Sequence, residues 1–156
     1  MYRAPEGRHI LPMIGIQKID HVGVRVRDKA VAVPFYESLG FKTLADAGFE
    51  QGHPIIMEHP SGVVINVLGP ATGEAEGNVL MDVEAKHPGY THIALRVDSL
   101  DATRAFMDEH GIEVTGGFEF GGLRALFIRD PDRNVIEFDE RIDQAEDARA
   151  MREPTH

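Results

Sequence analysis

Residues 21–26 read HVGVRV, and 71 positions later residues 92–97 read HIALRV. The same shift places residues 21–67 on residues 92–138 without a gap and makes nine of the 47 pairs identical, where unrelated sequences of average composition would give about three. The hydrophobic pattern repeats as well, because GVVINV near the end of the first copy corresponds to RNVIEF near the end of the second. The sequence therefore predicts one structural module that is written twice.

Each copy predicts a strand, a helix and three further strands. Polar and apolar residues alternate over residues 18–27, which is typical of a half-buried strand, and the apolar stripe of Val31, Phe35 and Leu39 is typical of a helix. Strands are expected at residues 18–27, 42–49, 54–59, 62–68, 90–98, 112–120, 124–130 and 134–139, with helices between Asp28 and Gly40 and from about 99 to 110. Two tandem βαβββ modules make an α+β fold.

The repeat also sets the expected boundaries along the chain. Gly and Pro in the stretch between the copies suit an exposed connection, and the end of the chain is highly charged. The expected organisation is an N-terminal arm (1–17), one domain (18–139) made of module one (18–68), a linker (69–89) and module two (90–139), and a charged C-terminal tail (140–156).

Composition narrows the class of protein. The 156 residues carry a formal net charge of −10, which disfavours a nucleic acid or an anionic membrane as partner. There is no cysteine, so neither a disulfide framework nor a thiolate metal site is expected, and no apolar run approaches the roughly 20 residues of a membrane helix. We expect a soluble, cytoplasmic protein whose partner is a small molecule.

Four polar residues stand out because they obey the repeat. His21 and His92 begin the first strand of each module, and Asn66 and Glu137 interrupt the apolar last strands, again 71 positions apart. A polar side chain among Val and Ile on a strand costs free energy unless it has a partner. Equivalent positions of a duplicated fold come together around a pseudo-twofold axis. Two imidazoles and a carboxylate predict a divalent-metal site with open positions, formed by His21, His92 and Glu137.

The chain resembles the vicinal oxygen chelate superfamily, which includes glyoxalase I, epimerases, extradiol dioxygenases, fosfomycin-resistance enzymes and bleomycin-binding proteins. The resemblance rests on residues 19–26 (IDHVGVRV), 35–41 (FYESLGF), 91–97 (THIALRV) and 130–137 (DPDRNVIE) and extends over residues 18–139. It implies a cup-shaped mixed sheet built from both modules, with one divalent ion (Fe, Mn, Ni, Co or Zn) at its base. It also implies a homodimer, in which some members place module one of one chain against module two of the other.

Four further residues acquire roles from this resemblance. Arg25 stands where glyoxalase I has an arginine that contacts the acidic end of glutathione, although it could also compensate buried carboxylates. Asn66 replaces a carboxylate of glyoxalase I, and whether it contacts the metal stays open. Phe127 stands where extradiol dioxygenases have a tyrosine, and we assign it to the substrate pocket together with Arg25 and Asn66. Glu58 is a candidate catalytic base beside Glu137, or else a solvated residue of a hairpin.

The resemblance implies a function but leaves its class open. The favoured interpretation is a metal-dependent, glyoxalase-I-like enzyme (isomerase, epimerase or lyase) that acts on a small oxygenated, anionic metabolite chelated to the ion. One alternative is a ring-cleaving dioxygenase that uses Fe(II) and O2. Another is a protein that binds a small molecule or antibiotic in the cup without chemistry.

Overall fold

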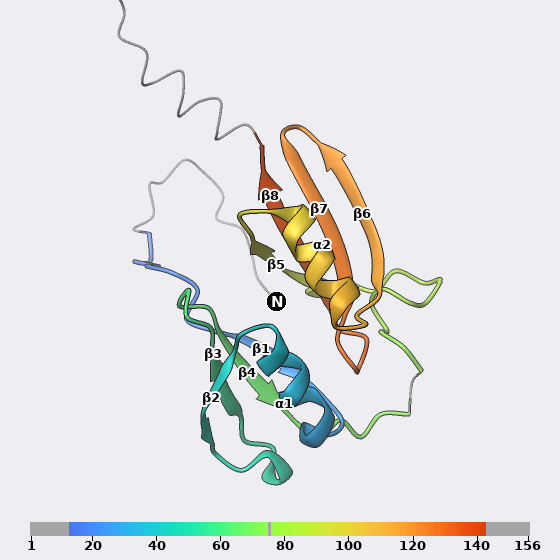
Figure 1. Cartoon of the computed structure of the whole chain (residues 1–156). Coiled ribbons are helices and arrows are strands. Elements are labelled where there is room, and N and C mark those ends of the chain that lie inside the picture. The colour runs from blue at the N-terminus through green and yellow to red at the C-terminus, as the bar shows by residue number, and fades with distance from the viewer. Residues whose placement is uncertain (1–12, 75, 143–156) are drawn as a thin grey trace, which may run out of the picture.

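The computed structural model describes residues 13–74 and 76–142, and these form two modules with the same element order (Figure 1). Module one contains β1 (Val22–Arg25), α1 (Lys29–Ser38), β2 (Lys42–Asp46), β3 (Ile55–Glu58) and β4 (Val64–Leu68). Module two contains β5 (His92–Arg96), α2 (Leu100–Glu109), β6 (Val114–Phe120), β7 (Leu123–Arg129) and β8 (Val135–Arg141). The predicted α+β fold with two βαβββ modules is confirmed.

Each module holds one mixed sheet of four strands. The strand order is β1-β4-β3-β2 in module one and β5-β8-β7-β6 in module two. In each sheet the first strand pairs in parallel with the last one, and the other pairs are antiparallel. Among the described residues the two sheets are not hydrogen-bonded to each other, so β1 and β5 are both outer strands with one open edge.

The helices begin and end at the residues that the sequence indicates. Asp28 caps α1 by accepting a hydrogen bond from the backbone N–H of Ala30 at 2.8 Å, and Ser99 caps α2 by accepting from Ala102 at 3.1 Å. Gly40 and Gly111 follow the two helices with φ of 100° and 65°, a region that glycine adopts without strain. The repeated capping pattern therefore fixes two helices of equal length.

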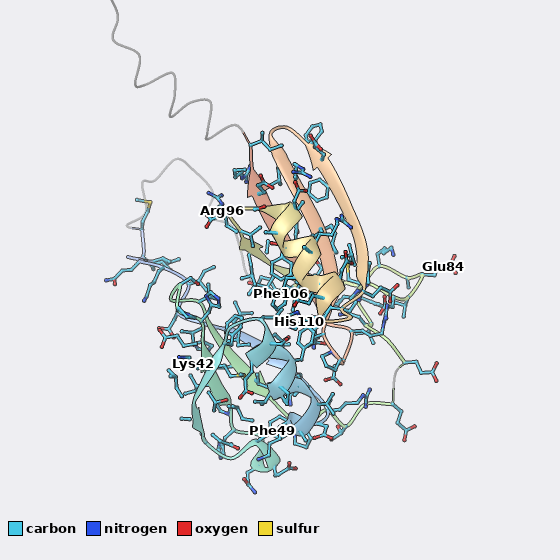
Figure 2. All side chains as sticks on the ribbon, in the orientation of Figure 1. Lys42, Phe49, Glu84, Arg96, Phe106 and His110 are labelled. Atoms are coloured by element: carbon cyan, nitrogen blue, oxygen red, sulfur yellow. The ribbon has the colours of Figure 1, made fainter. Side chains whose placement is uncertain are left out.

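The two faces of each sheet differ in what they carry. In β4 the side chains of Ile65 and Val67 are buried towards the helix side, while Asn66 between them is on the opposite face. We call the face away from the helix the open face of each module. The buried apolar side chains of both modules form one continuous cluster, and Phe106 and His110 of α2 stack beside it, at the end of the helix nearest to module one (Figure 2).

Some strands are shorter or longer than expected. The strand expected at 42–49 ends at Asp46, because its carboxylate accepts hydrogen bonds from Gly48 and Phe49 and turns the chain into a short 3-10 helix. The first strand covers only Val22–Arg25 instead of 18–27. Strand β8 continues to Arg141, two residues into the expected tail, through pairing with β7. Residues 1–12 and 143–156 lie outside the described residues, as does any expectation about their structure.

None of the helices in the described ranges is long and apolar enough to cross a membrane.

Candidate metal and substrate site

Two of the three predicted metal ligands are in contact on the open face of module two. Strand β5 pairs with β8 so that Ala94 lies opposite Glu137, and this register puts His92 on the same face as Glu137. The Nε2 atom of His92 lies 2.8 Å from the Oε2 atom of Glu137. The side chain of His92 is 37% exposed and that of Glu137 only 8%, so the pair is reached from the histidine side.

This pair has the geometry of neighbouring ligands of one ion. Metal–nitrogen and metal–oxygen bonds of about 2.0–2.2 Å at right angles to each other place the two donor atoms about 3 Å apart. The distance of 2.8 Å between Nε2 and Oε2 is close to this value. The residues present therefore fit part of a divalent-metal donor set, with His92 and Glu137 as the ligands.

The environment of Glu137 favours its neutral form in the absence of an ion. Burial raises the pKa of the Glu137 carboxyl to about 7, and the neighbouring carboxyl group of Asp139 adds to this shift. Asp139 follows Glu137 by two residues in β8 and therefore shares its face, and its Oδ1 atom is buried without a hydrogen-bond partner. A cation at this position would stabilise the ionised forms of both carboxyl groups, because it compensates the negative charge that burial disfavours.

Aromatic side chains line the same face. Phe127 of β7 lies opposite Glu137, and its ring contacts the ring of His92 edge-on, with centroids 6.1 Å apart. Phe118 of β6 continues this surface, with its ring centroid 6.0 Å from that of Phe127. The open face of module two thus combines the contacting imidazole and carboxylate of His92 and Glu137 with an aromatic surface.

Module one places its candidate residues on the corresponding open face. Gly23 of β1 lies opposite Asn66 of β4, so Arg25, two residues further on, shares the face of Asn66. Across the hairpin, Ile56 lies opposite Asn66 and Glu58 opposite Val64. Glu58 therefore shares the open face with Asn66 and Arg25.

Both histidines are oriented by the residue that precedes them. The Nδ1 atom of His21 lies 2.8 Å from a carboxylate oxygen of Asp20, and the Nδ1 atom of His92 lies 2.8 Å from the hydroxyl oxygen of Thr91. The hydrogen bond to His21 lowers the pKa of the Asp20 carboxyl. Both contacts involve Nδ1 and leave Nε2 to other partners, and in His92 Nε2 contacts Glu137. The sequence reasoning did not single out Asp20 and Thr91, although the same 71-residue shift relates them.

A single chain does not bring His21 to the other two predicted ligands. No group of three or more His, Asp or Glu side chains within residues 13–74 and 76–142 is arranged to hold a metal ion. His21 directly precedes β1 in one sheet, whereas His92 and Glu137 belong to the other. The structure places His21 and Asn66 on the open face of module one, and His92 and Glu137 on the open face of module two. We call these two pairs the candidate half-sites.

A cavity of about 500 Å³ lies between the modules. It is lined by β1 residues from Val22 to Arg25, by part of the linker and by His92 with its neighbours on β5. The open edges of β1 and β5 therefore border a space large enough for a small ligand.

Comparison with known proteins identifies the class of protein that this fold defines. The family model of the Glyoxalase/Bleomycin resistance protein/Dioxygenase superfamily matches residues 18–138, and the chain belongs to that superfamily. The superfamily includes lyases, isomerases and dioxygenases as well as members that do not catalyse a reaction.

The similar proteins include one named as a lyase and one named as an antibiotic binding protein. The chain is 25% identical over 130 residues to the glyoxalase domain-containing protein RDO1 of Mycosarcoma maydis, covering 80% of this chain and 68% of that protein. It is 24% identical over 132 residues to a lactoylglutathione lyase of Schizosaccharomyces pombe, covering 77% of this chain but only 44% of the lyase. The crystal structure of TnmS3, an antibiotic binding protein from Streptomyces sp. CB03234, is similar with a TM-score of 0.62 and 25% identity, covering 83% of this chain and 99% of that chain.

Proposed function

We propose that this protein is a metal-dependent, glyoxalase-I-like enzyme that acts on a small oxygenated anion. The observation that carries the proposal is the contact of 2.8 Å between Nε2 of His92 and Oε2 of Glu137 on an open sheet face. A buried carboxylate next to an imidazole whose other nitrogen is already held is typical of a metal-binding pair. The similarity to a lactoylglutathione lyase supports a glyoxalase-like role.

The complete site forms between two copies of the chain. The half-site with His21 and Asn66 from one copy meets the half-site with His92 and Glu137 from the other, in a symmetric homodimer. The outer edges of β1 and β5 support this arrangement, because among the described residues neither edge is hydrogen-bonded to another strand. One divalent ion would then be held by three protein ligands from two chains, with positions left for a substrate.

The residues around the ion would divide the work of binding and proton transfer. A bound divalent ion supplies a Lewis acid that polarises a substrate oxygen. Arg25 is exposed on the open face of module one and attracts an anionic substrate, while Phe127 contacts its apolar part. Glu137, or Glu58 on the facing half-site, moves the proton.

Metal analysis of purified variants tests this proposal. The wild type is expected to carry about one divalent ion per chain. His21→Ala, His92→Ala and Glu137→Ala should each empty the site, whereas His53→Ala, which removes an exposed histidine elsewhere, should not. Full occupancy in the three ligand variants would contradict the assignment.

A mixed dimer tests whether the site spans two chains. Coexpression of His21→Ala and Glu137→Ala chains with different tags allows purification of the heterodimer. If each site takes His21 from one chain and Glu137 from the other, the heterodimer regains one intact site and about half of the wild-type metal content. A site built within each chain predicts no metal in the heterodimer, and a monomer by light scattering would contradict the dimer itself.

The similarity to TnmS3 favours a second candidate, a protein that binds a small molecule without chemistry. The aromatic side chains of Phe127 and Phe118 on one face suit such a ligand. The two candidates differ in their dependence on the ion, because a glyoxalase-like reaction requires it. Solvent-proton exchange into a carbon acid that stops when the ion is removed supports the enzyme, and metal-independent ligand binding supports the binding protein.

A further inference from the structure

We infer that the apolar segment of residues 13–19 docks across the open face of module two of a second copy of this chain and closes the substrate cup there. This inference rests on the proposed shared site, because the shared site places the start of β1 beside the partner's Glu137. It goes beyond the shared site, which requires neither the docking of residues 13–19 nor a contact surface on module two for them.

The apolar segment is unusually exposed in one chain. It carries four large apolar side chains, each at least 79% exposed: Met13, Ile14, Ile16 and Ile19. The segment contains no helix or strand, and its backbone makes a local hydrogen bond from the N–H of Ile16 to the carbonyl of Ile14. Apolar side chains gathered in this way on a folded protein mark an interaction surface.

Module two offers a matching surface at the outer end of its sheet. Phe120 is 82% exposed and Phe118 is 44% exposed, and both lie on the open face because they pair with Leu123 and Ala125 of β7. Phe118 contacts Phe127, whose ring contacts His92. An aromatic strip of three phenylalanines, Phe120, Phe118 and Phe127, therefore leads from the outer end of module two to the half-site.

The direction of the chain agrees with this docking. The shared site places β1 and the partner's β5 around the pseudo-twofold axis that relates the two modules, with His21 next to the partner's His92. A twofold relation across the strands makes β1 antiparallel to the partner's β5. The residues before His21 then continue in the direction in which β5 and β8 run, and this is the direction of the outer end, because Arg141 of β8 pairs with Leu123. The apolar segment therefore runs towards Phe118 and Phe120 of the second copy and not away from them.

The length of the apolar segment also agrees with this docking. Phe120 is two strands away from Glu137, and its partner Leu123 is four residues along β7 from Phe127, the residue opposite Glu137. With strand spacings of about 4.8 Å and a rise of about 3.3 Å per residue, the distance from Glu137 to Phe120 is about 16 Å. Five extended residues, from His21 back to Ile16, span about 17 Å. Ile16 can therefore contact Phe120 of the second copy.

The natural absence of cysteine makes cross-linking a clean test. Chains with Ile16→Cys and chains with Phe120→Cys, carrying different tags, are mixed, exchanged and treated with a short bismaleimide. The expected result is a covalent heterodimer in high yield. The control replaces Phe120→Cys with Leu44→Cys on β2 of module one, an exposed residue away from the strip, and should give a yield at least tenfold lower.

Three outcomes would overturn the inference. These are equal yields for the Phe120 and Leu44 positions, cross-links only between two Ile16→Cys chains, or a link within one chain in the double variant Ile16→Cys/Phe120→Cys. The cross-link needs no metal ion. It therefore reports on the docking separately from metal analysis of the His92→Ala and Glu137→Ala chains, whose failure to lose metal would count against the proposed function instead.

Discussion

The hydroxyl group of Tyr36 donates a hydrogen bond of 2.7 Å to the carboxylate of Asp130, which lies 94 residues away in the other module. Both side chains are buried, and burial together with this carboxylate raises the pKa of the Tyr36 hydroxyl. Asp130 also accepts a hydrogen bond from the side-chain amide of Asn134, which donates a second one to the backbone carbonyl of Arg25. These contacts join α1 and β1 of module one to the turn before β8. They therefore help to fix the position of one half-site relative to the other.

Removing the tyrosine hydroxyl should loosen this junction. Tyr36→Phe keeps the ring but leaves a buried carboxylate of Asp130 short of one donor, which costs about 1–3 kcal/mol of the free energy of unfolding. The thermal midpoint should fall by roughly 2–12 °C, as measured by calorimetry. The control Tyr90→Phe removes a hydroxyl from a fully exposed residue and should leave the midpoint unchanged.

The linker contributes stability that depends on acid pH. Asp82 accepts hydrogen bonds from Arg133, Arg129 and the backbone of Asn78, and these hold the pKa of its carboxyl at about 2, below the ordinary value of 3.8. Because the pKa is lowered in the folded state, the stabilisation is present above about pH 4 and is lost as the pH falls towards 2. At pH 7, Asp82→Asn should therefore lower the free energy of unfolding by about 1–2 kcal/mol, and the thermal midpoint should fall with it. The difference between the two proteins should shrink in scans at pH 3, and a difference that stays constant from pH 7 to pH 3 would exclude this origin.

The charge of the half-site in module one should control metal affinity. With Asn66, two neutral imidazoles and one carboxylate leave a divalent ion with a net charge near +1, which attracts an anionic substrate. Asn66→Glu should tighten metal binding and weaken binding of anionic chelators, because a fourth ligand brings the charge near zero. Asn66→Ala should change metal affinity little if the amide does not contact the ion. Metal titration of the three proteins checks this, and an unchanged affinity in Asn66→Glu would mean that residue 66 does not face the ion.

The hydrogen bond between Asp20 and His21 should matter for the ion although Asp20 is no ligand. Asp20→Ala frees Nδ1 of His21 and should reduce metal affinity by about 10–100-fold, because a ligand histidine loses its fixed orientation. Lys18→Ala changes the charge of the same segment without touching the ring and serves as the control. Competition with a chelator of known affinity measures both variants, and equal affinities would show that the contact is incidental.

Oxygen consumption separates the enzyme classes. Phe127 stands opposite Glu137 and provides no hydroxyl group to a bound catechol. With Fe(II) present, catechols should therefore cause no oxygen uptake in an electrode assay. Rapid uptake with any catechol would favour the ring-cleaving dioxygenase over the isomerase, epimerase or lyase.

The fold could be predicted from the sequence because the patterns that indicate its strands and helices are local and occur in both modules. Alternation, caps such as Asp28 and the glycine after each helix all report on neighbours in the chain. The repeat singled out His92 and Glu137, and their contact arises because the first and last strands of module two are neighbours in its sheet. The separation of His21 from that pair did not, because local patterns carry no information about how two modules are arranged around their junction. The end of the strand at Asp46 was missed for a different reason, since its side chain competes with the sheet for backbone N–H groups.

The shared cluster of buried side chains has a consequence for how the chain folds. Met57 and Val67 of module one belong to the same cluster as Met107 and Leu126 of module two, so one hydrophobic core runs through both modules. Heat or denaturant should therefore unfold both halves in one cooperative transition, although the sequence is a tandem duplication. A substitution of a buried residue in one half should therefore lower the stability of the other half as well, although the two halves are copies of one module.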